Sequence, residues 1–388
     1  MSYDTIVIGL GGMGSAALYQ LAKRGANVLG IDRFDPPHTN GSTHGESRVT
    51  RLAVGEGPEY VPLVARTHEI WHELTSQTGN PMLYESGGYI ICPKGGGAGW
   101  HHGGDFVQRS AELAQQYGVP HEVLSAAEVR HRHPLVRITD KSHAYFEPSG
   151  GIVDPEVAIR GQLGLARTLG AEIRPNERVL NLKHDAHSVT VTTDQGSYRA
   201  ENVIVSAGAW VHSFLPKHLQ APLGVYRQVM YWFEVEDLDL FSVENFPFLL
   251  WIDSTKEDYF GAFPIAKGHK PAIKLLTEQF HDPCDPDTVP RSITQAEIEA
   301  FADRFIPRNL LGVTKRCIGA EACLYTVTAD EHFIIDWHPD SERVLIVSPC
   351  SGHGFKHSAA IGESAAQLML ENKSTIDLSS FNFARFNK

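Results

Sequence analysis

The hydrophobic and polar positions near the N-terminus change from a strand pattern to a helix pattern and back. Residues 4–8 form a short apolar run, residues 16–24 carry apolar side chains at helical spacing, and residues 27–31 form a second apolar run. This order predicts a strand, a tight turn, a helix and a second strand. Such an order is typical of the opening of a parallel α/β sheet.

The same patterns predict elements further along the chain. A packed helix is expected over 60–76 and a strand over 83–92, and Asp154 is expected to cap a helix that starts at Pro155 and ends at Gly170. Residues 358–371 predict an amphipathic helix. Strand-like runs follow at 172–175, 178–184, 189–193, 202–206, 226–234, 258–274, 333–336 and 344–347. Antiparallel sheet is expected where Gly and Pro interrupt the strands of the second half.

The composition and charge exclude several kinds of partner. With 42% hydrophobic and 21% charged residues the chain has the composition of an ordinary globular protein. The formal net charge of -12, without a run of clustered Lys and Arg, argues against a nucleic-acid surface. The apolar stretches are shorter than the roughly 20 residues of a membrane span. We therefore expect a soluble, cytoplasmic protein with no nucleic-acid or membrane partner.

The cysteines and histidines give no metal-site signal. The five cysteines are odd in number and scattered, and they lack C-x-x-C spacing, which argues against a disulfide framework and a zinc site. His101 and His102 lie in a glycine-rich stretch, but adjacent histidines cannot face one ion from a regular element. We therefore expect no metal.

A glycine motif between the first strand and helix carries the strongest signal. In Gly9-Leu10-Gly11-Gly12-Met13-Gly14 the first glycine permits the turn, the second lets the backbone approach a pyrophosphate, and the last lets the helix pack on the strand. The helix N-terminus adds unpaired N–H groups. Asp32 ends the second strand near the offset at which an acid accepts hydrogen bonds from a ribose. The motif predicts a dinucleotide and leaves NAD or FAD open.

Three other stretches are candidates for contact with the same ligand. The polar, turn-rich segment 36–48 is expected to wrap the cofactor. Small residues at 207–209 follow a strand, and the glycine-rich turn at 351–356 opens a helix, so both could approach the dinucleotide closely. Arg48 and Arg51 would share one face if they lay on a helix, and two solvated arginines are the alternative.

Motifs spread over the chain carry a family resemblance. The chain resembles the monomeric sarcosine oxidase and N-methyltryptophan oxidase family nearly end to end, which implies FAD rather than NAD. The matching stretches are 9–14, 36–38 with 41–51, 55–57 with 60–63, 226–229, 323–326, 330–336 and 351–356.

The resemblance implies roles for individual residues. Cys323, in a C-x-Y-T motif, would carry the flavin covalently; a buried free cysteine is the alternative, and Cys317 has no such motif. Arg51 and Lys356 would hold a substrate carboxylate. Arg48 and His44 would lie against the flavin as catalytic residues. A third catalytic residue, Lys274, would promote the reaction with oxygen by stabilising the superoxide that forms first.

We predict two further sets of contacts. Tyr325, Phe260 and Glu278 are predicted to line the substrate site beside Arg51 and Lys356. The predicted cofactor contacts are Gly9, Gly11, Gly12, Met13, Gly14, Asp32, Arg33, Ser42, Thr43, His44, Arg48, Val179, Ala207, Gly208, Trp210, Cys323, Gly352, His353, Gly354 and Lys356.

The substrate region departs from the family pattern. Glu278 stands where sarcosine oxidases carry a histidine, and the aromatic pair Tyr259-Phe260 suggests that a family tyrosine hydroxyl is missing. A carboxylate in the pocket wall would favour a larger or more cationic substrate than sarcosine. The alternative is a local shift that places Glu278 in solvent.

The implied activity is oxidative N-demethylation of a sarcosine-like N-methyl amino acid, giving the demethylated amino acid, formaldehyde and H2O2. Alternatives are oxidation of a glycated, cyclic or primary amine, or a non-catalytic flavin-binding protein, which the presence of Arg51, Lys274 and Lys356 together disfavours. The partners would be a small amine and oxygen, and a monomer is expected.

The expected fold class is α/β with an α+β second domain, because 388 residues exceed what one hydrophobic core usually organises. A Rossmann-like FAD-binding domain is predicted over 1–80, 146–218 and 328–388. A substrate domain with a mixed or antiparallel sheet is predicted over 81–145 and 219–327.

Overall fold

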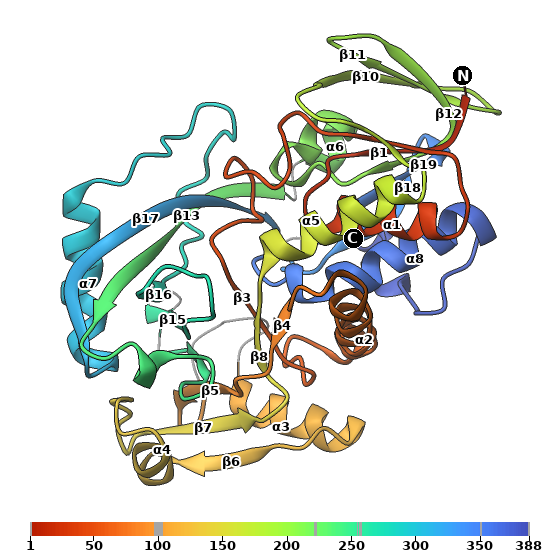
Figure 1. Cartoon of the computed structure of the whole chain (residues 1–388). Coiled ribbons are helices and arrows are strands. Elements are labelled where there is room, and N and C mark those ends of the chain that lie inside the picture. The colour runs from red at the N-terminus through yellow and green to blue at the C-terminus, as the bar shows by residue number, and fades with distance from the viewer. Residues whose placement is uncertain are drawn as a thin grey trace.

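The structure is a computed structural model that describes residues 2–96, 104–220, 223–253, 255, 258–349 and 351–386. His101 and His102 therefore lie outside the described residues. Two large sheets and one small sheet organise the chain (Figure 1). The predicted α/β class with an α+β part is confirmed.

The first large sheet has a parallel centre. Strand β1 (Ser2–Ile8) pairs in parallel with β2 (Val28–Ile31) on one side and β12 (Ser197–Val205) on the other. Parallel pairs extend it with β9 (Glu172–Arg174) next to β2 and β19 (Ser341–Ser348) next to β12. The antiparallel strands are β10 (Val179–His184), β11 (Val189–Thr193) and β18 (Ile334–His338).

Helices α1 (Gly12–Lys23), α2 (Val61–Thr78), α5 (Pro155–Thr168) and α8 (Ser358–Glu371) pack beside this sheet. Asp154 caps α5 as predicted, accepting a hydrogen bond from the Val157 N–H. The predicted amphipathic character of α8 is wrong, because nearly all its residues are buried. It packs against both α1 and α2, and a Cβ on Gly362 would lie 2.4 Å from the Ala16 Cβ.

The second large sheet is mainly antiparallel, with strand order β17-β13-β16-β15-β14-β5-β7-β6. Its longest pair joins β13 (Leu223–Val235) to β17 (Val313–Thr328), whereas β14 and β5 pair in parallel. The other strands are β5 (Gly88–Pro93), β6 (Glu122–Ser125), β7 (Ser142–Glu147), β14 (Phe248–Trp251), β15 (Phe260–Phe263) and β16 (Ile273–Leu276). The other helices are α3 (Phe106–Tyr117), α4 (Ala126–Arg132), α6 (Lys217–Gln220) and α7 (Gln295–Asn309). Short 3-10 turns are η1 (Pro58–Tyr60), η2 (Gly208–Phe214), η3 (Asp239–Phe241), η5 (Phe355–His357), η6 (Ser379–Phe381) and η7 (Phe383–Phe386).

The small sheet joins β3 (Arg48–Thr50), β8 (Gly151–Val153) and β4 (Leu83–Tyr84). Two predictions from the sequence are wrong in this region. The single strand predicted over 83–92 is two strands in different sheets, since the chain turns between them at Gly87, whose φ is +72°. Arg48 begins a strand rather than a helix, so Arg48 and Arg51 do not share a helical face.

In the described part of the chain, the helices are all too short or too polar to cross a bilayer.

Candidate active site

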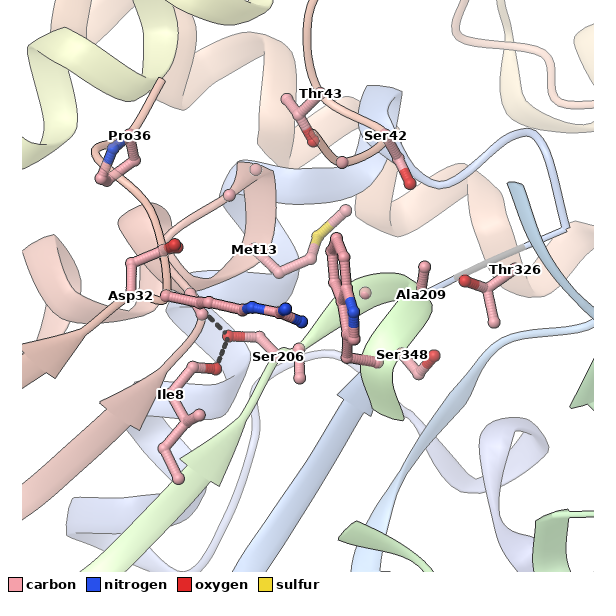
Figure 2. Close-up of a pocket in the computed structure, with 18 of the residues that line it drawn as sticks. Ile8, Met13, Asp32, Pro36, Ser42, Thr43, Ser206, Ala209, Thr326 and Ser348 are labelled. Carbon is pink, nitrogen blue, oxygen red and sulfur yellow. Dashed lines mark hydrogen bonds between the residues drawn. The ribbon is translucent and has the colours of Figure 1, made fainter. Parts of the chain in front are cut away.

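A cavity of about 330 Å³ lies where several strands of the first sheet end (Figure 2). Its walls include Ile8 at the end of β1, Asp32 after β2, Ser206 after β12 and Ser348 at the end of β19. Ligands of open α/β sheets bind outside the carboxyl ends of the strands. The position of the cavity therefore matches that of a nucleotide site.

The glycine motif shapes one wall of this large cavity. Gly11 is the N-cap of α1 and makes no side-chain cap hydrogen bond, so the first N–H groups of the helix remain available to a ligand. Gly9 has a φ of +84°, and a Cβ there would lie 2.5 Å from the Ser206 carbonyl oxygen. Gly14, predicted as a cofactor contact, does not line the cavity. A Cβ on Gly14 would lie 1.7 Å from the Gly9 carbonyl oxygen, so this glycine serves the packing of the helix on the turn.

Asp32 is buried and organises the adjacent turns. One carboxylate oxygen accepts a hydrogen bond from the Leu10 N–H at 2.6 Å, and the other accepts one from the Phe34 N–H at 2.8 Å. The acid therefore ties the glycine motif to the end of β2. Arg33 also lines the cavity and pairs with Asp287 at 2.6 Å, which in turn accepts a hydrogen bond from the Trp210 indole.

Most of the predicted cofactor contacts line the large cavity, and a few do not. His353 and Lys356 line a neighbouring smaller cavity, and His44 lines neither cavity. The predicted residues on the large cavity are Gly9, Gly11, Gly12, Met13, Asp32, Arg33, Ser42, Thr43, Arg48, Val179, Ala207, Gly208, Trp210, Gly352 and Gly354.

The smaller cavity, of about 50 Å³, adjoins the large one. Arg48, Tyr325, Gly352 and Phe355 line both, so the two spaces share a wall. Cys323, Glu278, Lys356, Tyr259 and Phe263 complete much of the smaller cavity. The arrangement suits a flat cofactor ring that meets a small substrate at the shared wall.

Glu278 is a buried acid of the smaller cavity, with 6% of its surface exposed. The Tyr325 hydroxyl donates a hydrogen bond to its Oε1 at 3.2 Å, and Oε2 is without a hydrogen-bond partner among the described residues. Burial raises the pKa of Glu278 to about 8. The structure thus resolves the two alternatives for Glu278: it faces the cavity and not solvent.

The prediction that Phe260 lines the substrate site is wrong. Its ring stacks with Phe301 and Phe305 of α7 on the other face of the sheet. Successive residues of a strand point to opposite faces, so Tyr259 and Phe263 line the cavity instead. The side chain of Tyr259 is therefore part of this wall.

Arg51 and Lys356 both form ion pairs with Glu56, a third charged residue that the sequence analysis did not predict as part of the site. The Glu56 carboxylate pairs with Arg51 Nη2 at 2.5 Å and with Lys356 Nζ at 3.1 Å, and all three side chains are buried. Lys356 lines the smaller cavity, whereas Arg51 does not. Burial lowers the pKa of Lys356 to about 8 although Glu56 raises it. Glu56 lies in the stretch 55–57 that carries the resemblance, which was the available signal.

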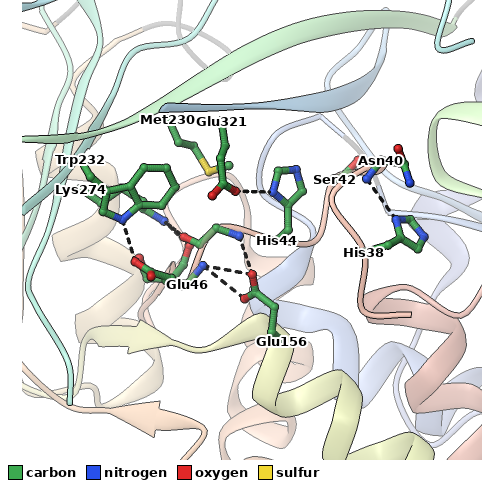
Figure 3. Close-up of polar contacts among 12 residues, drawn as sticks. His38, Asn40, Ser42, His44, Glu46, Glu156, Met230, Trp232, Lys274 and Glu321 are labelled. Carbon is green, nitrogen blue, oxygen red and sulfur yellow. Dashed lines mark hydrogen bonds and ion pairs between the residues drawn. The ribbon is translucent and has the colours of Figure 1, made fainter. Parts of the chain in front are cut away.

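Lys274 and His44 belong to one polar network (Figure 3). Lys274 Nζ donates to the carbonyl oxygens of Gly45 at 3.0 Å and Ser47 at 2.5 Å, and lies 4.0 Å from the centre of the Phe263 ring. Burial holds the pKa of Lys274 well below its usual range, and the Arg48 charge adds to this effect. Lys274 therefore holds the loop that leads to Arg48 through two hydrogen bonds.

His44 is held by an acid that the sequence did not indicate. Its Nδ1 lies 3.1 Å from Glu321 Oε2, and its buried Nε2 has no hydrogen-bond partner among the described residues. The hydrogen bond from His44 lowers the pKa of Glu321 to about 2. Lys270 Nζ pairs with the same acid at 3.2 Å and with Glu46 at 3.3 Å, which links the loop before β3 to the second large sheet.

Two cysteines of β17 occupy different surroundings. Cys323 is buried and lines the smaller cavity, with Gln228 of β13 opposite it. Burial raises the pKa of its thiol, and the charges of Arg48 and Lys274 act in the opposite direction. Cys317 is half-buried, and its thiol donates to the Gly319 carbonyl away from both cavities.

Comparison with known proteins identifies the family. The family model described as FAD dependent oxidoreductase matches residues 4–368. The chain belongs to the FAD-dependent oxidoreductases. Within them it is 39% identical to the monomeric sarcosine oxidase of Bacillus sp. (strain B-0618) over 389 residues, which covers 99% of this chain and 96% of that protein. It is also 36% identical to the N-methyl-L-tryptophan oxidase of Yersinia pestis (strain Pestoides F), with all of both chains covered.

The predicted resemblance is therefore confirmed, and the chain is an FAD-dependent oxidase that acts on CH–NH groups of amines. Among solved structures, the open form of NikD, an unusual amino acid oxidase essential for nikkomycin biosynthesis, has the same fold. Its TM-score is 0.84 at 24% identity, with 98% of this chain and 97% of that chain covered.

The large cavity fits this cofactor. The uncapped N-terminus of α1 suits a pyrophosphate, and Asp32 has the place of the ribose acceptor. A Cβ on Gly11 would meet only the Thr43 hydroxyl, at 3.7 Å, so the backbone here is open to close approach. The residues that would hold the flavin end are those of the wall shared with the smaller cavity.

Proposed function

We propose that this FAD-dependent oxidase demethylates an N-methyl amino acid that carries a free carboxylate, and releases formaldehyde, the demethylated amino acid and H2O2. The observation that carries the proposal is the smaller cavity, which places the buried cation Lys356 next to the wall shared with the cofactor cavity. The identity to sarcosine and N-methyltryptophan oxidases supports the same reaction.

The chain's own residues would bind and orient the substrate. Two cations, Arg48 and Lys356, line the smaller cavity among the described residues. Lys356 would bind the carboxylate, with Arg51 joining once its contact with Glu56 loosens. The rings of Tyr259, Tyr325 and Phe355 would exclude water from the reacting carbon. Bound FAD supplies the two-electron acceptor for the C–H bond next to the amine nitrogen.

A substrate panel tests the reaction. The purified protein would be assayed with sarcosine, larger N-methyl amino acids, proline, glycine and a glycated amino acid, with H2O2 and formaldehyde measured in each case. The proposal expects equal amounts of both products from N-methyl substrates. H2O2 without formaldehyde, from any of the other amines alone, would replace it with one of the alternative oxidations.

We further propose that Cys323 carries the flavin covalently. It lines the smaller cavity beside the shared wall, whereas Cys317 lines neither cavity. After acid precipitation the wild-type pellet is expected to be yellow, with flavin on the Cys323 peptide by mass spectrometry. In Cys323→Ser all the flavin should move to the supernatant, and Cys317→Ser should behave as wild type. Yellow pellets from both variants would contradict the assignment.

Glu278 is proposed to set substrate charge preference as a function of pH. With a pKa of about 8 the carboxyl is mostly neutral at pH 7 and becomes negative above that value. The ratio of kcat/KM for Nα-methyl-lysine to that for N-methyl-norleucine should therefore rise from pH 7 to pH 9. We expect a rise of at least about fivefold, since unit charges about 4 Å apart attract by about 1 kcal/mol even in water.

The titration of Lys356 cancels in this ratio of kcat/KM values, because Lys356 acts on the carboxylate that both substrates share. In Glu278→Gln, which has the same size and no charge, the ratio should stay flat with pH. A rise of the same size in this variant would show that Glu278 is not the cause.

A further inference from the structure

A cluster of metal-ligating side chains lies apart from both cavities. Cys92 Sγ lies 3.3 Å from His143 Nε2 and 3.3 Å from Asp105 Oδ1, and His143 Nε2 lies 3.1 Å from the Asp105 carboxylate. These ligand atoms all lie within 4.8 Å of one another. We propose that Cys92, Asp105 and His143 bind a divalent transition-metal ion, with Zn²⁺ as the best match.

Three separate elements hold the side chains in place. Cys92 on β5 and His143 on β7 are direct neighbours in an antiparallel pair, so their side chains share one face of the sheet. Asp105 is the N-cap of α3, which packs on the same two strands. Its Oδ1 also accepts the Gln108 N–H at 3.1 Å, and Oδ1 lies within 3.3 Å of both Cys92 Sγ and His143 Nε2 with a second lone pair left for an ion. The site is thus built on rigid elements and not on a flexible loop.

The spacing fits a tetrahedral ion. Zn–S bonds of about 2.3 Å and Zn–N or Zn–O bonds of about 2.0 to 2.2 Å place neighbouring ligand atoms about 3.3 to 3.6 Å apart. The observed separations of 3.1 to 3.3 Å require only a slight expansion. A catalytic Cys-His-Asp relay does not fit, because the thiol and the carboxylate both meet the same ring nitrogen, Nε2.

The ligand set also has a suitable charge and an open position. Binding would form Zn–S, Zn–N and Zn–O bonds and release the thiol proton to solvent, with no change of oxidation state. Thiolate and carboxylate would then offset the ion's two positive charges, and they must do so against the positive charge of the Arg109 guanidinium, which is nearby on α3. Cys92 is buried, whereas the His143 and Asp105 side chains are 17% and 22% exposed, which leaves room for a water as fourth ligand.

Zn²⁺ binding to the FAD-loaded, full-length protein tests the proposal. The protein would be stripped with a chelator, desalted and titrated with Zn²⁺ against a chromophoric competitor. X-ray absorption of the loaded protein would then give the ligand atoms. We expect one equivalent of Zn²⁺, with one sulfur at about 2.3 Å in its first shell.

Variants separate this site from others. Asp105→Asn keeps an N-cap residue, and Cys92→Ser keeps the size of the side chain, so both should fold with an unchanged flavin spectrum. Both should bind Zn²⁺ at least about tenfold more weakly, since even loss of a group behind a metal ligand costs about that much. Cys317→Ser should bind as wild type.

Two results would overturn the proposal. One is a wild-type protein that takes up no Zn²⁺ at stoichiometric concentration. The other is bound Zn²⁺ with only nitrogen and oxygen neighbours, which would place the ion elsewhere. Both results are measured on the wild-type protein and do not depend on the folding of a variant.

Discussion

Replacing Lys274 with Met is expected to slow reoxidation of the reduced enzyme by oxygen about 100-fold to 1,000-fold, while reduction by substrate under anaerobic conditions changes only a few-fold. A buried cation stabilises the superoxide that forms first, and losing one preorganised electrostatic group typically costs a factor of this size. Stopped-flow spectroscopy of the flavin band measures the two half-reactions separately.

The position of Lys274 supports this separation. Its ammonium group donates to the carbonyl oxygens of Gly45 and Ser47, on the loop that leads to Arg48, and it lines neither cavity. Because burial lowers its pKa, the charge is present below that pKa and is lost above it. Wild-type reoxidation should therefore slow as pH rises, and the Met variant should lack this step.

Lys270→Met is the matched control. Lys270 belongs to the same network, but it is partly exposed and paired with Glu46 and Glu321. Its loss should change reoxidation by less than about threefold, the size of effect that a partly exposed ion pair typically has. If Lys274→Met instead slows both half-reactions equally, the lysine supports the loop and has no separate role with oxygen.

Replacing Lys356 with Met is expected to lower kcat/KM for carboxylate-bearing substrates by about 100-fold or more. Truncating one partner of a buried charge pair costs about 2 to 5 kcal/mol, which corresponds to about 30-fold to several thousand-fold. Lys356 is the member of the Arg51, Glu56 and Lys356 cluster that lines the smaller cavity. Steady-state kinetics with sarcosine would measure the change.

An amine without a carboxylate, such as N-methylbenzylamine, separates binding from folding. Its kcat/KM should change little in Lys356→Met, because it makes no use of the cation. Lys356→Arg should recover part of the loss with sarcosine, since it restores the charge. An equal loss for both amines would mean that the variant damages the site as a whole.

The local elements around the cofactor could be predicted from the sequence because their causes are local. The glycines between β1 and α1 are required by the backbone itself, and the cap at Asp154 acts within one helical turn. The motif series also identified the family, which comparison confirms. Helix α7 was missed although Thr294 and Glu297 form a capping box at its start, a signal that could have been used.

The tertiary structure decided what lies around each side chain. Only the packing shows that α8 is buried by α1 and α2, that Tyr259 rather than Phe260 faces the cavity, and that Glu56 joins Arg51 to Lys356. Each of these depends on partners distant in the chain or on which face of a sheet is covered. The contact of Cys92 with His143 joins residues 51 positions apart, so no spacing rule could reveal it.

The sequence by itself determined the cofactor fold and the reaction class, because short motifs encode them. The charges and ligands around the substrate were decided only where distant strands and helices pack together.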